Sequence, residues 1–553
     1  MKKSMIRRAG CSICILLLFL SLVGCSKNSE GYGINSKSDL QANVDPFGIY
    51  DKEVTITAAR RDFGEEIPVG DDAPWNQLYA EYGIDLKVEW SAGSNQYKSK
   101  LNTAIASENL PALFQVIGAE QMNTLVRADL VADLTEVFEE YASERVKKLY
   151  STEIGKAALE SVTFDGKLRF IPIQVTEPLA DTNLLYIRKD WLDNLGMDIP
   201  QNLEELREVA IAFTYEDPDL NGKDDTYGLA VAGKELTYLN SFFTGFGVYP
   251  GAGVDGMLFF SYDESGDVVW DGEKQGTEKA LQYLQNLYQA GAIPQDFAVY
   301  DLNKVWEDLN QGKAGICIGA RGYPEWAIQD TFRNNNEAEW YAMNMLTEDG
   351  SDSLLVGFQP TNTALAVSAD CEHPEAIIRM LNIVTEMNAP ESDMYDSYYL
   401  ESNRQEAGTS IVYPAQDPEV EKKEAQALFD AYERQSMEGL SGNNQQLYQS
   451  LMGFEENQDE DDWSSWNRFY PEEGHSYYVI YHMDVEKEIT MNLWQDLPTS
   501  FMTSKLAVWN QLYQEALVNT ISGNSLEIWN NFLINWKTLG GTEIAEEVKR
   551  SLY

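Results

Sequence analysis

A short acidic loop carries the most regular spacing of oxygen-bearing side chains in the chain. It reads DPDLNGKDDT, and side-chain oxygens stand at its positions 1, 3, 5 and 9, with a glycine at position 6. Alternate residues of a tight loop can aim their oxygens inward, and Ca²⁺ takes roughly six to eight oxygen ligands. The pattern predicts a structural calcium site, whose ligands are Asp217, Asp219, Asn221, the backbone carbonyl of Lys223, and Asp225.

The match of this loop to a helix–loop–helix calcium motif is partial. Position 12 is Gly228, where a bidentate Glu is usual, and no helix pattern clearly follows the loop. An acidic turn that needs no metal is the alternative interpretation.

Motifs for nucleophilic, zinc or nucleotide chemistry are missing from the sequence. It contains no GxxxxGK[ST], no GxSxG and no HExxH, and its only histidines are His373, His475 and His482. A zinc or Ser-His-Asp enzyme is therefore not expected. The 89 acidic residues supply many carboxylate pairs, which leaves glycoside hydrolysis open.

The charge and composition describe an acidic globular protein. The 553 residues include 41 Lys and Arg against 89 Asp and Glu, a formal net charge of -48, and 44% of them are hydrophobic. Such a charge repels nucleic acid and anionic membranes, so neither is an expected partner. Aromatic residues make up 12% of the chain, which is high for so polar a composition and needs a reason.

The N-terminal segment has the layout of a bacterial lipoprotein signal. Four basic residues precede an apolar run from Ile13 to Val23, and the next residues, Gly24 and Cys25, resemble the end of a lipobox. We expect cleavage after residue 24 and diacylation of Cys25, which anchors the chain to the extracellular face of the cell membrane. Cleavage changes the net charge from -48 to -52, because four positive charges are lost. An ordinary signal peptide with a chance cysteine is the alternative.

Residues 25–46 are rich in Ser, Asn and Gly and lack apolar periodicity, which is typical of a flexible tether. Beyond them only Cys317 and Cys371 remain as cysteines, in or beside apolar strand-like stretches. Both are predicted to be free thiols, and a disulfide between them is the alternative.

Strands and helices alternate through the first half of the chain. Short β-branched runs at 54–58, 84–90 and 113–117 are separated by helical patterns at 74–82 and 97–106. This order predicts βαβ units and a mainly parallel sheet. Further strands are expected at 184–188, 314–318 and 364–367, and helices at 190–195, 203–212, 278–290, 374–384 and over the last 50 residues. The fold class is α/β.

Several segments together resemble the family 1 extracellular solute-binding proteins of bacterial ABC importers, especially the large lipoprotein group related to the alginate-binding proteins. Each segment is weak alone, and their order and spacing carry the resemblance. They are LYAEYGI at 78–84, KLNTAIASENLP at 100–111, YIRKDWLDNLG at 186–196, LEEL at 203–206, the loop from 217 to 229, LYQAG at 287–291, GKAG at 312–315 and WKTLGG at 536–541.

The resemblance implies a two-lobed periplasmic-binding-protein-like fold of type II, with discontinuous lobes joined by hinge strands. Residues 47–173 with 355–388 would form lobe one, and 174–354 with 389–553 lobe two. A ligand would lie in the cleft between them, and the lobes would close on it. The group's calcium loop matches here at the five ligands named above, but Thr226 stands where some relatives have Glu.

The resemblance also implies a monomeric binding protein, not an enzyme. Such a protein captures a carbohydrate, leaves it unchanged and delivers it to permease subunits. Aromatic rings stack on the apolar faces of sugars, and charged or amide groups bond their hydroxyls. Candidate ligand residues lie near strand ends, near the expected crossing between the lobes at 170–188, and in a loop after the acidic run at 459–462. They are Arg60, Arg61, Asp62, Trp75, Glu177, Asp181, Arg321, Tyr323, Trp326, Trp463 and Trp466. For each, packing or a solvated surface is the alternative.

Neutral oligosaccharides are the favoured ligand class, because the acidic charge disfavours uronates unless Arg60, Arg61 or Arg321 faces the cleft. A secreted glycan-active hydrolase or lyase that uses paired carboxylates is the alternative function. A peptide or lipid ligand is a third option.

Overall fold

The computed structural model describes residues 44–552, except 63–73, 174, 176–181, 252–257, 358–362, 390–391, 393, 395–409, 416, 484–488, 495–498 and 524. The signal segment 1–24, Cys25, the tether to residue 43, Glu177 and Asp181 thus lie outside the described residues. The chain divides into two compact units, 1–44 and 45–553, and every element below belongs to the second.

The first sheet has five strands in the order β2-β1-β3-β14-β6. β1 runs parallel to β2 and β3, while β14 lies antiparallel to β3 and β6. Its alternating or continuous apolar residues are buried in one core, as the β-branched runs predicted. The strands are β1 (Val54–Asp62), β2 (Ile84–Gly93), β3 (Leu113–Ile117), β6 (Phe170–Ile173) and β14 (Thr363–Val367).

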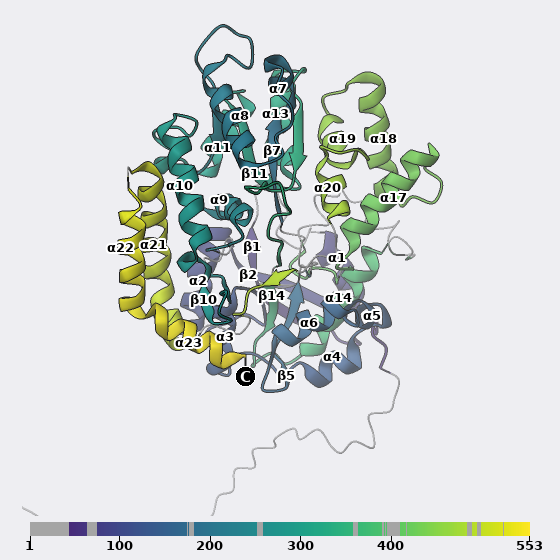
Figure 1. Ribbon diagram of the computed structural model, residues 1–553. Coiled ribbons are helices and arrows are strands. Elements are labelled where there is room, and N and C mark those ends of the chain that lie inside the picture. Colours follow the sequence, from purple (N-terminus) through teal and green to yellow (C-terminus); the bar gives the residue numbers. More distant parts are fainter. Residues whose placement is uncertain are drawn as a thin grey trace, which may run out of the picture. The chain divides into compact units, whose positions relative to one another are not determined.

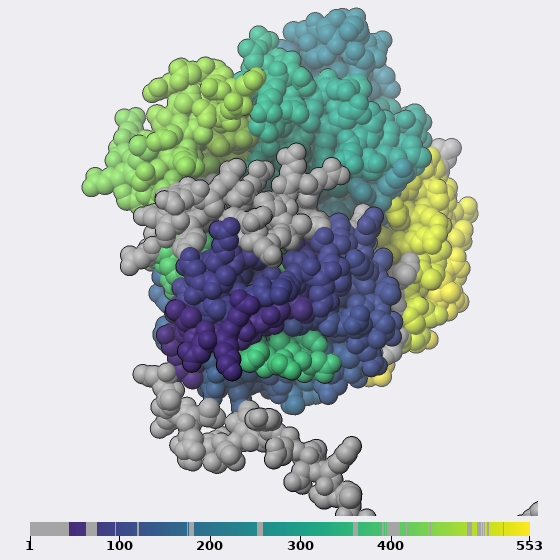
Figure 2. Space-filling view, turned by 180° about the vertical axis from the view of Figure 1, so that it is seen from behind, coloured from purple at the N-terminus to yellow at the C-terminus, as the bar shows by residue number. Residues whose placement is uncertain are grey.

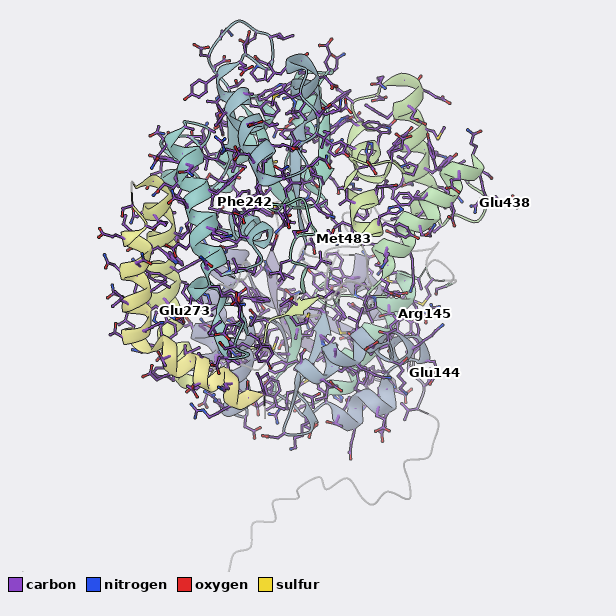
Figure 3. The ribbon with its side chains drawn as sticks, viewed as in Figure 1. Glu144, Arg145, Phe242, Glu273, Glu438 and Met483 are labelled. Atoms are coloured by element: carbon purple, nitrogen blue, oxygen red, sulfur yellow. The ribbon has the colours of Figure 1, made fainter. Side chains whose placement is uncertain are left out.

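Helices pack on this first sheet through their apolar faces. In one of them, α2, Tyr97 and Leu101 are fully buried, as the predicted stripe requires. Arg145 of α5, which is labelled in Figure 3, donates to Glu386 of α14 at 2.9 Å. The helices are α1 (Pro74–Glu81), α2 (Ser94–Ala106), α3 (Ala119–Arg127), α4 (Thr135–Tyr141), α5 (Glu144–Tyr150), α6 (Glu153–Ser161) and α14 (Pro374–Met387).

The second sheet has four strands in the order β12-β7-β11-β8. β8 runs parallel to β11, but β7 lies antiparallel to both β11 and β12. The three strands from which a parallel sheet was predicted, β1, β2 and β3, are parallel, but each sheet as a whole is mixed. β7 enters the second sheet directly after β6 of the first, and β14 returns to the first sheet after the last strand of the second. The strands are β7 (Asn183–Arg188), β8 (Tyr227–Ala230), β11 (Ala314–Ala320) and β12 (Trp340–Met343).

Helices and a C-terminal layer complete the core around the second sheet (Figure 1). α10 packs against α21, and α21 against α22, with Trp270 and Trp536 rings 4.8 Å apart. Glu273 accepts from the Trp536 indole at 2.9 Å. The helices are α7 (Lys189–Leu195), α8 (Leu203–Tyr215), α9 (Thr237–Phe242), α10 (Gln275–Gln289), α11 (Leu302–Asn310), α12 (Tyr323–Trp326), α13 (Gln329–Asn334), α21 (Ser500–Ser522), α22 (Glu527–Trp536) and α23 (Thr542–Ser551).

A group of four helices is attached to the edge strand β12. Asn467 donates to the carbonyl of Trp340 at 3.1 Å, and Ala342 forms a bridge with Gly474. The group consists of α17 (Val420–Arg434), α18 (Gly442–Asn457), α19 (Trp463–Phe469) and α20 (Ser476–His482). Trp463 and Trp466 therefore lie on helix α19, and their prediction as loop residues was wrong. The acidic run before them ends at Asp462, the N-cap of this helix.

Short strands pair outside the two sheets: β4 (Thr163–Phe164) with β5 (Lys167–Leu168), β9 (Phe260–Tyr262) with β10 (Val268–Trp270), and β13 (Val356–Gly357) with β15 (Thr490–Met491).

Cys317 and Cys371 are free thiols, as predicted, so the alternative of a disulfide between them was wrong. Within the described part of the chain, no helix combines the length and apolarity needed to cross a membrane.

The predicted lobe boundaries stay a prediction. Ile411 and Val412 are buried in the core of the first sheet, although the boundary at 388/389 assigns them to the other lobe. The strands of the first sheet lie within the residue ranges predicted for lobe one, and those of the second sheet within the ranges predicted for lobe two.

Candidate functional site

The carboxyl ends of the parallel strands define one edge of each sheet. In the first sheet Ile173 ends β6 beside Thr363, which in turn pairs with Ile117 at the end of β3. In the second sheet Ala320 ends β11 opposite Asn183, where β7 begins. Residues 174–182 alone connect β6 to β7, so both edges flank the same short stretch of chain. Ligands of open α/β sheets bind outside such edges, which makes this region the candidate site.

Two of the arginine candidates lie at the edge of the first sheet, at the end of β1. The Arg60 guanidinium is buried and lies 5.2 Å from the ring centre of Trp75, a cation–π contact. Trp75 itself is buried in the core of the first sheet. Arg61 is half-buried, and Asp62 ends the strand, with its side chain outside the described residues. A ligand role for these four residues stays a prediction.

An aromatic cluster lies at the edge of the second sheet, where α12 follows β11. Trp326 is 46% exposed, and its ring meets Trp306 of α11 edge to face at 5.3 Å and Tyr323 at 4.8 Å. Tyr323 is buried and stacks on Tyr186 of β7 at 5.8 Å. The β11-edge cluster therefore holds one exposed indole on a rigid aromatic base.

A glycine in β11 makes room for this base. A Cβ built on Gly319 would meet the ring of Tyr323 at 2.2 Å, so any side chain there displaces the tyrosine. Sequence analysis missed Trp306, because nothing in a single helix of the sequence shows which distant aromatic residue it will meet.

Arg321 is turned into the protein. It forms an ion pair with Glu421 of α17, and its carbonyl accepts from Ser476 of α20 at 2.7 Å. Burial lowers the pKa of Arg321, but the charges of Glu421 and Tyr477 and the hydrogen bonds to both side chains together outweigh burial and raise the pKa. Its charge is thus balanced within the chain, and a ligand role for Arg321 stays a prediction.

The tryptophans of α19 take part in packing. Trp463 is buried and stacks on Phe332 of α13 at 5.7 Å. Trp466 is half-buried and meets the ring of His475 at 4.7 Å. These contacts pack α19 against α13 and against the start of α20, and a ligand role for either tryptophan stays a prediction.

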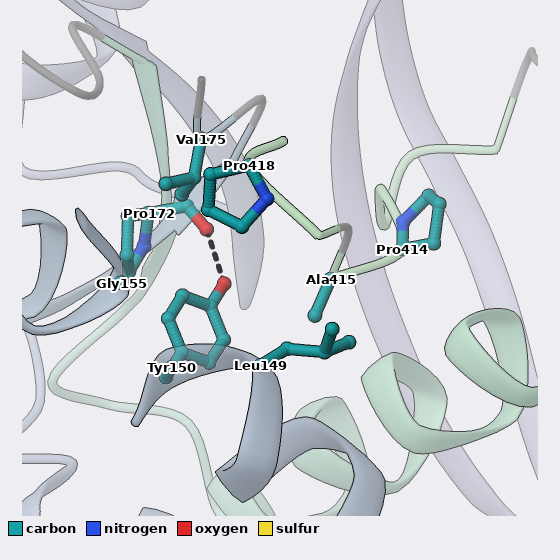
Figure 4. A pocket seen from close by; sticks show the side chains of 8 residues that line it. All are labelled: Leu149, Tyr150, Gly155, Pro172, Val175, Pro414, Ala415 and Pro418. Carbon is teal, nitrogen blue, oxygen red and sulfur yellow. Dashed lines mark hydrogen bonds between the residues drawn. The ribbon is translucent and has the colours of Figure 1, made fainter. Parts of the chain in front are cut away.

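Two hollows border the first sheet. The hollow in Figure 4, beside the bond from the Tyr150 hydroxyl to the Pro172 carbonyl, has a free volume of about 10 Å³. That is at the lower limit for one water molecule, so it holds no sugar. The other, which we call the α2 groove, is open and measures about 470 Å³. Its lining residues are Ser91, Ala92, Gln96, Ser99, Lys100 and Thr103.

The predicted calcium loop connects α8 to β8, so a strand follows it rather than a helix. The Asn221 amide nitrogen donates to Asp219 at 2.6 Å and to Asp225 at 3.0 Å, and the Gly222 amide donates to Asp217 at 3.1 Å. Gly222 has a φ of 77°, which the turn requires. The Asn221 side-chain amide thus joins two carboxylates, and the backbone amide of Gly222 holds the third.

This donor set fits a hard cation only with the help of neutral oxygens. Among the described residues, no three His, Cys, Asp or Glu side chains are gathered as a metal site requires. A calcium ion would therefore also need the Asn221 amide oxygen and the Lys223 carbonyl. The buried Thr226 hydroxyl donates to the Phe213 carbonyl of α8 at 2.8 Å.

Comparison with known proteins places the chain among binding proteins. The profile of the family described as bacterial extracellular solute-binding protein matches residues 66–387. The polygalacturonan/rhamnogalacturonan-binding protein YtcQ of Bacillus subtilis (strain 168) is 33% identical over 237 residues, 42% of this chain and 44% of that protein. The matches to curated relatives thus span less than half of each relative's length.

Two solved structures share the fold over nearly the whole chain. A solute-binding protein associated with an HMO-binding ABC transporter, from Bifidobacterium longum infantis ATCC 15697, has a TM-score of 0.63 at 13% identity and covers 90% of this chain and 98% of its own. The alginate-binding protein AlgQ2, solved without calcium ion, has a TM-score of 0.60 at 13% identity, with coverages of 91% and 99%. This likeness confirms the predicted α/β, two-lobed fold of the periplasmic binding proteins.

Proposed function

Because the chain belongs to the bacterial extracellular solute-binding proteins, we propose that it captures an oligosaccharide at the carboxyl-end edges of its two sheets and delivers it to the permease subunits of an ABC importer. The observation that carries the carbohydrate assignment is the β11-edge cluster. An exposed indole on a rigid aromatic base offers the flat apolar face on which a pyranose ring stacks. Relatives named for sugar binding support the same class.

In this proposal the protein is a monomer, and the lipid on Cys25 holds it at the outer face of the membrane. It binds its ligand without changing it, since its family is one of binding proteins. Because one relative is named for polygalacturonan, acidic sugars belong beside neutral ones among the ligands to be tried.

Titration calorimetry with a panel of oligosaccharides tests this function. We expect micromolar or tighter binding of at least one of them, with chromatography showing the sugar recovered at its original length. Recovery of a shortened sugar would instead indicate that the protein is a hydrolase or a lyase. Binding of peptides or lipids with no response to any oligosaccharide would contradict the carbohydrate assignment.

We also propose that the loop from Asp217 to Asp225 binds a structural Ca²⁺. A cation among three carboxylates would relieve their mutual repulsion and fix the connection between α8 and β8. The ion would stabilise the folded chain by mass action, by about 3 kcal/mol at a hundredfold excess over its dissociation constant.

Chelation is therefore expected to lower the melting temperature by a few degrees and to leave sugar binding intact. Differential scanning calorimetry with EGTA, and with Ca²⁺ added back, measures the effect. The variant Asp219→Asn should melt lower in Ca²⁺ and lose its response to EGTA, while Asp263→Asn, on a turn elsewhere, should respond as the native chain does. An identical melting temperature of the native chain in EGTA and in Ca²⁺ would contradict the proposed calcium site.

A further inference from the structure

The exposed ring of the β11-edge cluster is carried by a short segment that ends in a single helical turn. β11 ends at Ala320, and α12 spans only Tyr323–Trp326, so Trp326 follows the end of the strand closely. A single helical turn has little stability of its own, because the first turn of a helix is the costly one to form. The position of the Trp326 ring therefore depends on what holds residues 321–326, which we call the α12 turn.

Arg468 of α19 holds the α12 turn from one side. Its guanidinium forms an ion pair with Glu325, the neighbour of Trp326 in the chain. The arginine is itself fixed, since only 11% of its side chain is exposed and its guanidinium lies 4.8 Å from the ring centre of Phe469 and 5.9 Å from that of Tyr477. A guanidinium packed in this way loses less freedom when it pairs with a carboxylate than one on an open surface does.

Arg321 holds the α12 turn from the other side. Its ion pair runs outward from the turn to Glu421 of α17. Its backbone carbonyl accepts from the Ser476 hydroxyl of α20 at 2.7 Å. Tyr477 links the two ion pairs, because its hydroxyl donates to Glu421 at 3.4 Å and its ring lies beside the guanidinium of Arg468. Two ion pairs of opposite direction thus connect the turn to α17, α19 and α20.

The Trp326 ring in turn packs on the α12 turn. A Cβ built on Gly322 would lie 2.9 Å from the indole nitrogen of Trp326, so the ring lies against the backbone of the turn. Trp306 and Tyr323 meet the same ring edge to face. A shift of the turn would therefore move the ring and open its contacts with these two residues.

The helices α17 to α20, which we call the four-helix group, can act as a rigid support. The group has a core of its own, which includes Leu428, Leu451 and Phe469. It is also attached to the edge strand β12. Arg468 precedes Phe469 in α19, so its ion pair with the turn starts from a packed core. Figure 2 shows the group, in light green, against the teal chain around the second sheet.

We propose that the four-helix group braces the sugar-binding ring of the β11-edge cluster, with Arg468 as a positioning residue that fixes Trp326 through Glu325. The inference rests on the proposed sugar-binding function and deepens it by naming what sets the position of the ring. Arg468 touches no sugar itself. The brace gives a role to four helices that neither sheet needs for its own pairing.

A double-mutant cycle between Arg468 and Trp326, measured by titration calorimetry, tests this role. The probe is whichever of trigalacturonate, kestose and maltotriose the native chain binds most tightly. Arg468→Gln should weaken its binding about fivefold in the native chain and hardly at all in Trp326→Ala, because the arginine acts through the ring. Arg468→Lys, which keeps the charge, should restore part of the affinity.

Two further variants separate the ion pair from general effects on the group. Glu325→Gln breaks the pair at its exposed end, where 57% of the side chain is accessible, and should give a similar loss of affinity. Arg434→Gln, at the exposed end of α17, is the matched control and should bind as the native chain does. Circular dichroism and the melting temperature show that each variant is folded.

A measurement without sugar follows the ring itself. In the chain labelled with 5-fluorotryptophan, the fluorine resonance of Trp326 is identified by its absence in Trp326→Phe. It should shift or broaden in Arg468→Gln and in Glu325→Gln, return toward its native position in Arg468→Lys, and stay unchanged in Arg434→Gln. A role of Arg468 in stability alone would lower the melting temperature and leave this resonance in place.

Equal losses of affinity from Arg468→Gln in the native chain and in Trp326→Ala would overturn the positioning role. A Trp326 resonance that neither Arg468→Gln nor Glu325→Gln changes would overturn it as well. In both cases, sugar binding by the native chain still supports the proposed function. If none of the three sugars binds, the fluorine resonance decides the positioning role by itself, and the full oligosaccharide panel decides the proposed function.

Discussion

Trp326→Ala is expected to weaken binding of the best oligosaccharide ligand by about tenfold to a hundredfold, because removing a stacking ring at the centre of a contact typically costs about 1.4 to 2.8 kcal/mol. The indole is 46% exposed in the free protein, so its loss leaves no cavity. The melting temperature should therefore hardly change. Trp326→Phe, which keeps an aromatic face, should retain an intermediate affinity.

The control for this substitution is another exposed aromatic residue. Tyr262 of β9 is 51% exposed and lies outside the β11-edge cluster, so Tyr262→Ala should bind as the native chain does. Gly319→Ala tests the base of the cluster instead, since the added methyl group must displace the Tyr323 ring. It should reduce affinity although Trp326 remains. Native affinity in Trp326→Ala would show that the cluster does not contact the sugar.

Local patterns predicted the parts of the fold that local sequence determines. The apolar stripe of α2 and the β-branched run of β1 correctly predicted which residues are buried, because helix and strand periodicity alone decide it. The pairing of strands depends on segments hundreds of residues apart. β14 belongs to the first sheet although all four strands of the second sheet precede it in the sequence, and no pattern within it gives its antiparallel direction.

The site shows the same division between local and distant information. Trp326 was identified from its place after a strand, but its support by Trp306 needs the packing of α11 on α12. Arg321 and Glu421 are a hundred residues apart, so their ion pair was not foreseeable. The α2 groove did have a signal: the polar residues 96, 99, 100 and 103 alternate with the buried stripe. Only the register of β2 shows that they border a hollow.

Acidification is expected to destabilise the chain through His475, at the junction of α19 and α20. The imidazole is buried, its Nδ1 lies 3.2 Å from the Asn467 carbonyl oxygen, and the rings of Trp466 and Tyr470 cover it at 4.7 and 5.1 Å. Burial lowers the pKa of His475 from 6.5 to about 4. The carbonyl can only accept, so Nδ1 carries the proton of the neutral ring.

The direction of the pH effect on stability depends on whether the folded or the unfolded chain takes up the proton first. Above pH 6.5 the histidine is neutral in both states, and its full contribution to the free energy of unfolding is present. Between pH 6.5 and about 4 the unfolded chain is protonated while the native one is not, so stability falls by about 1.4 kcal/mol per pH unit. The loss reaches about 3 kcal/mol near pH 4 and then levels off.

Because many carboxylates titrate in the same range, the measurement is a difference between variants. Urea unfolding of the native chain and of His475→Gln, followed at pH 7.5, 6.0 and 5.0, removes the shared contribution of the carboxylates. The stability advantage of the native chain over His475→Gln should shrink as pH falls, since glutamine takes up no proton. His482→Gln, at the exposed end of α20, is the matched control for the loss of a histidine. A stability difference between the native chain and His475→Gln that stays constant with pH would mean that the buried ring is protonated without cost, and that the junction of α19 and α20 opens to solvent in the native state.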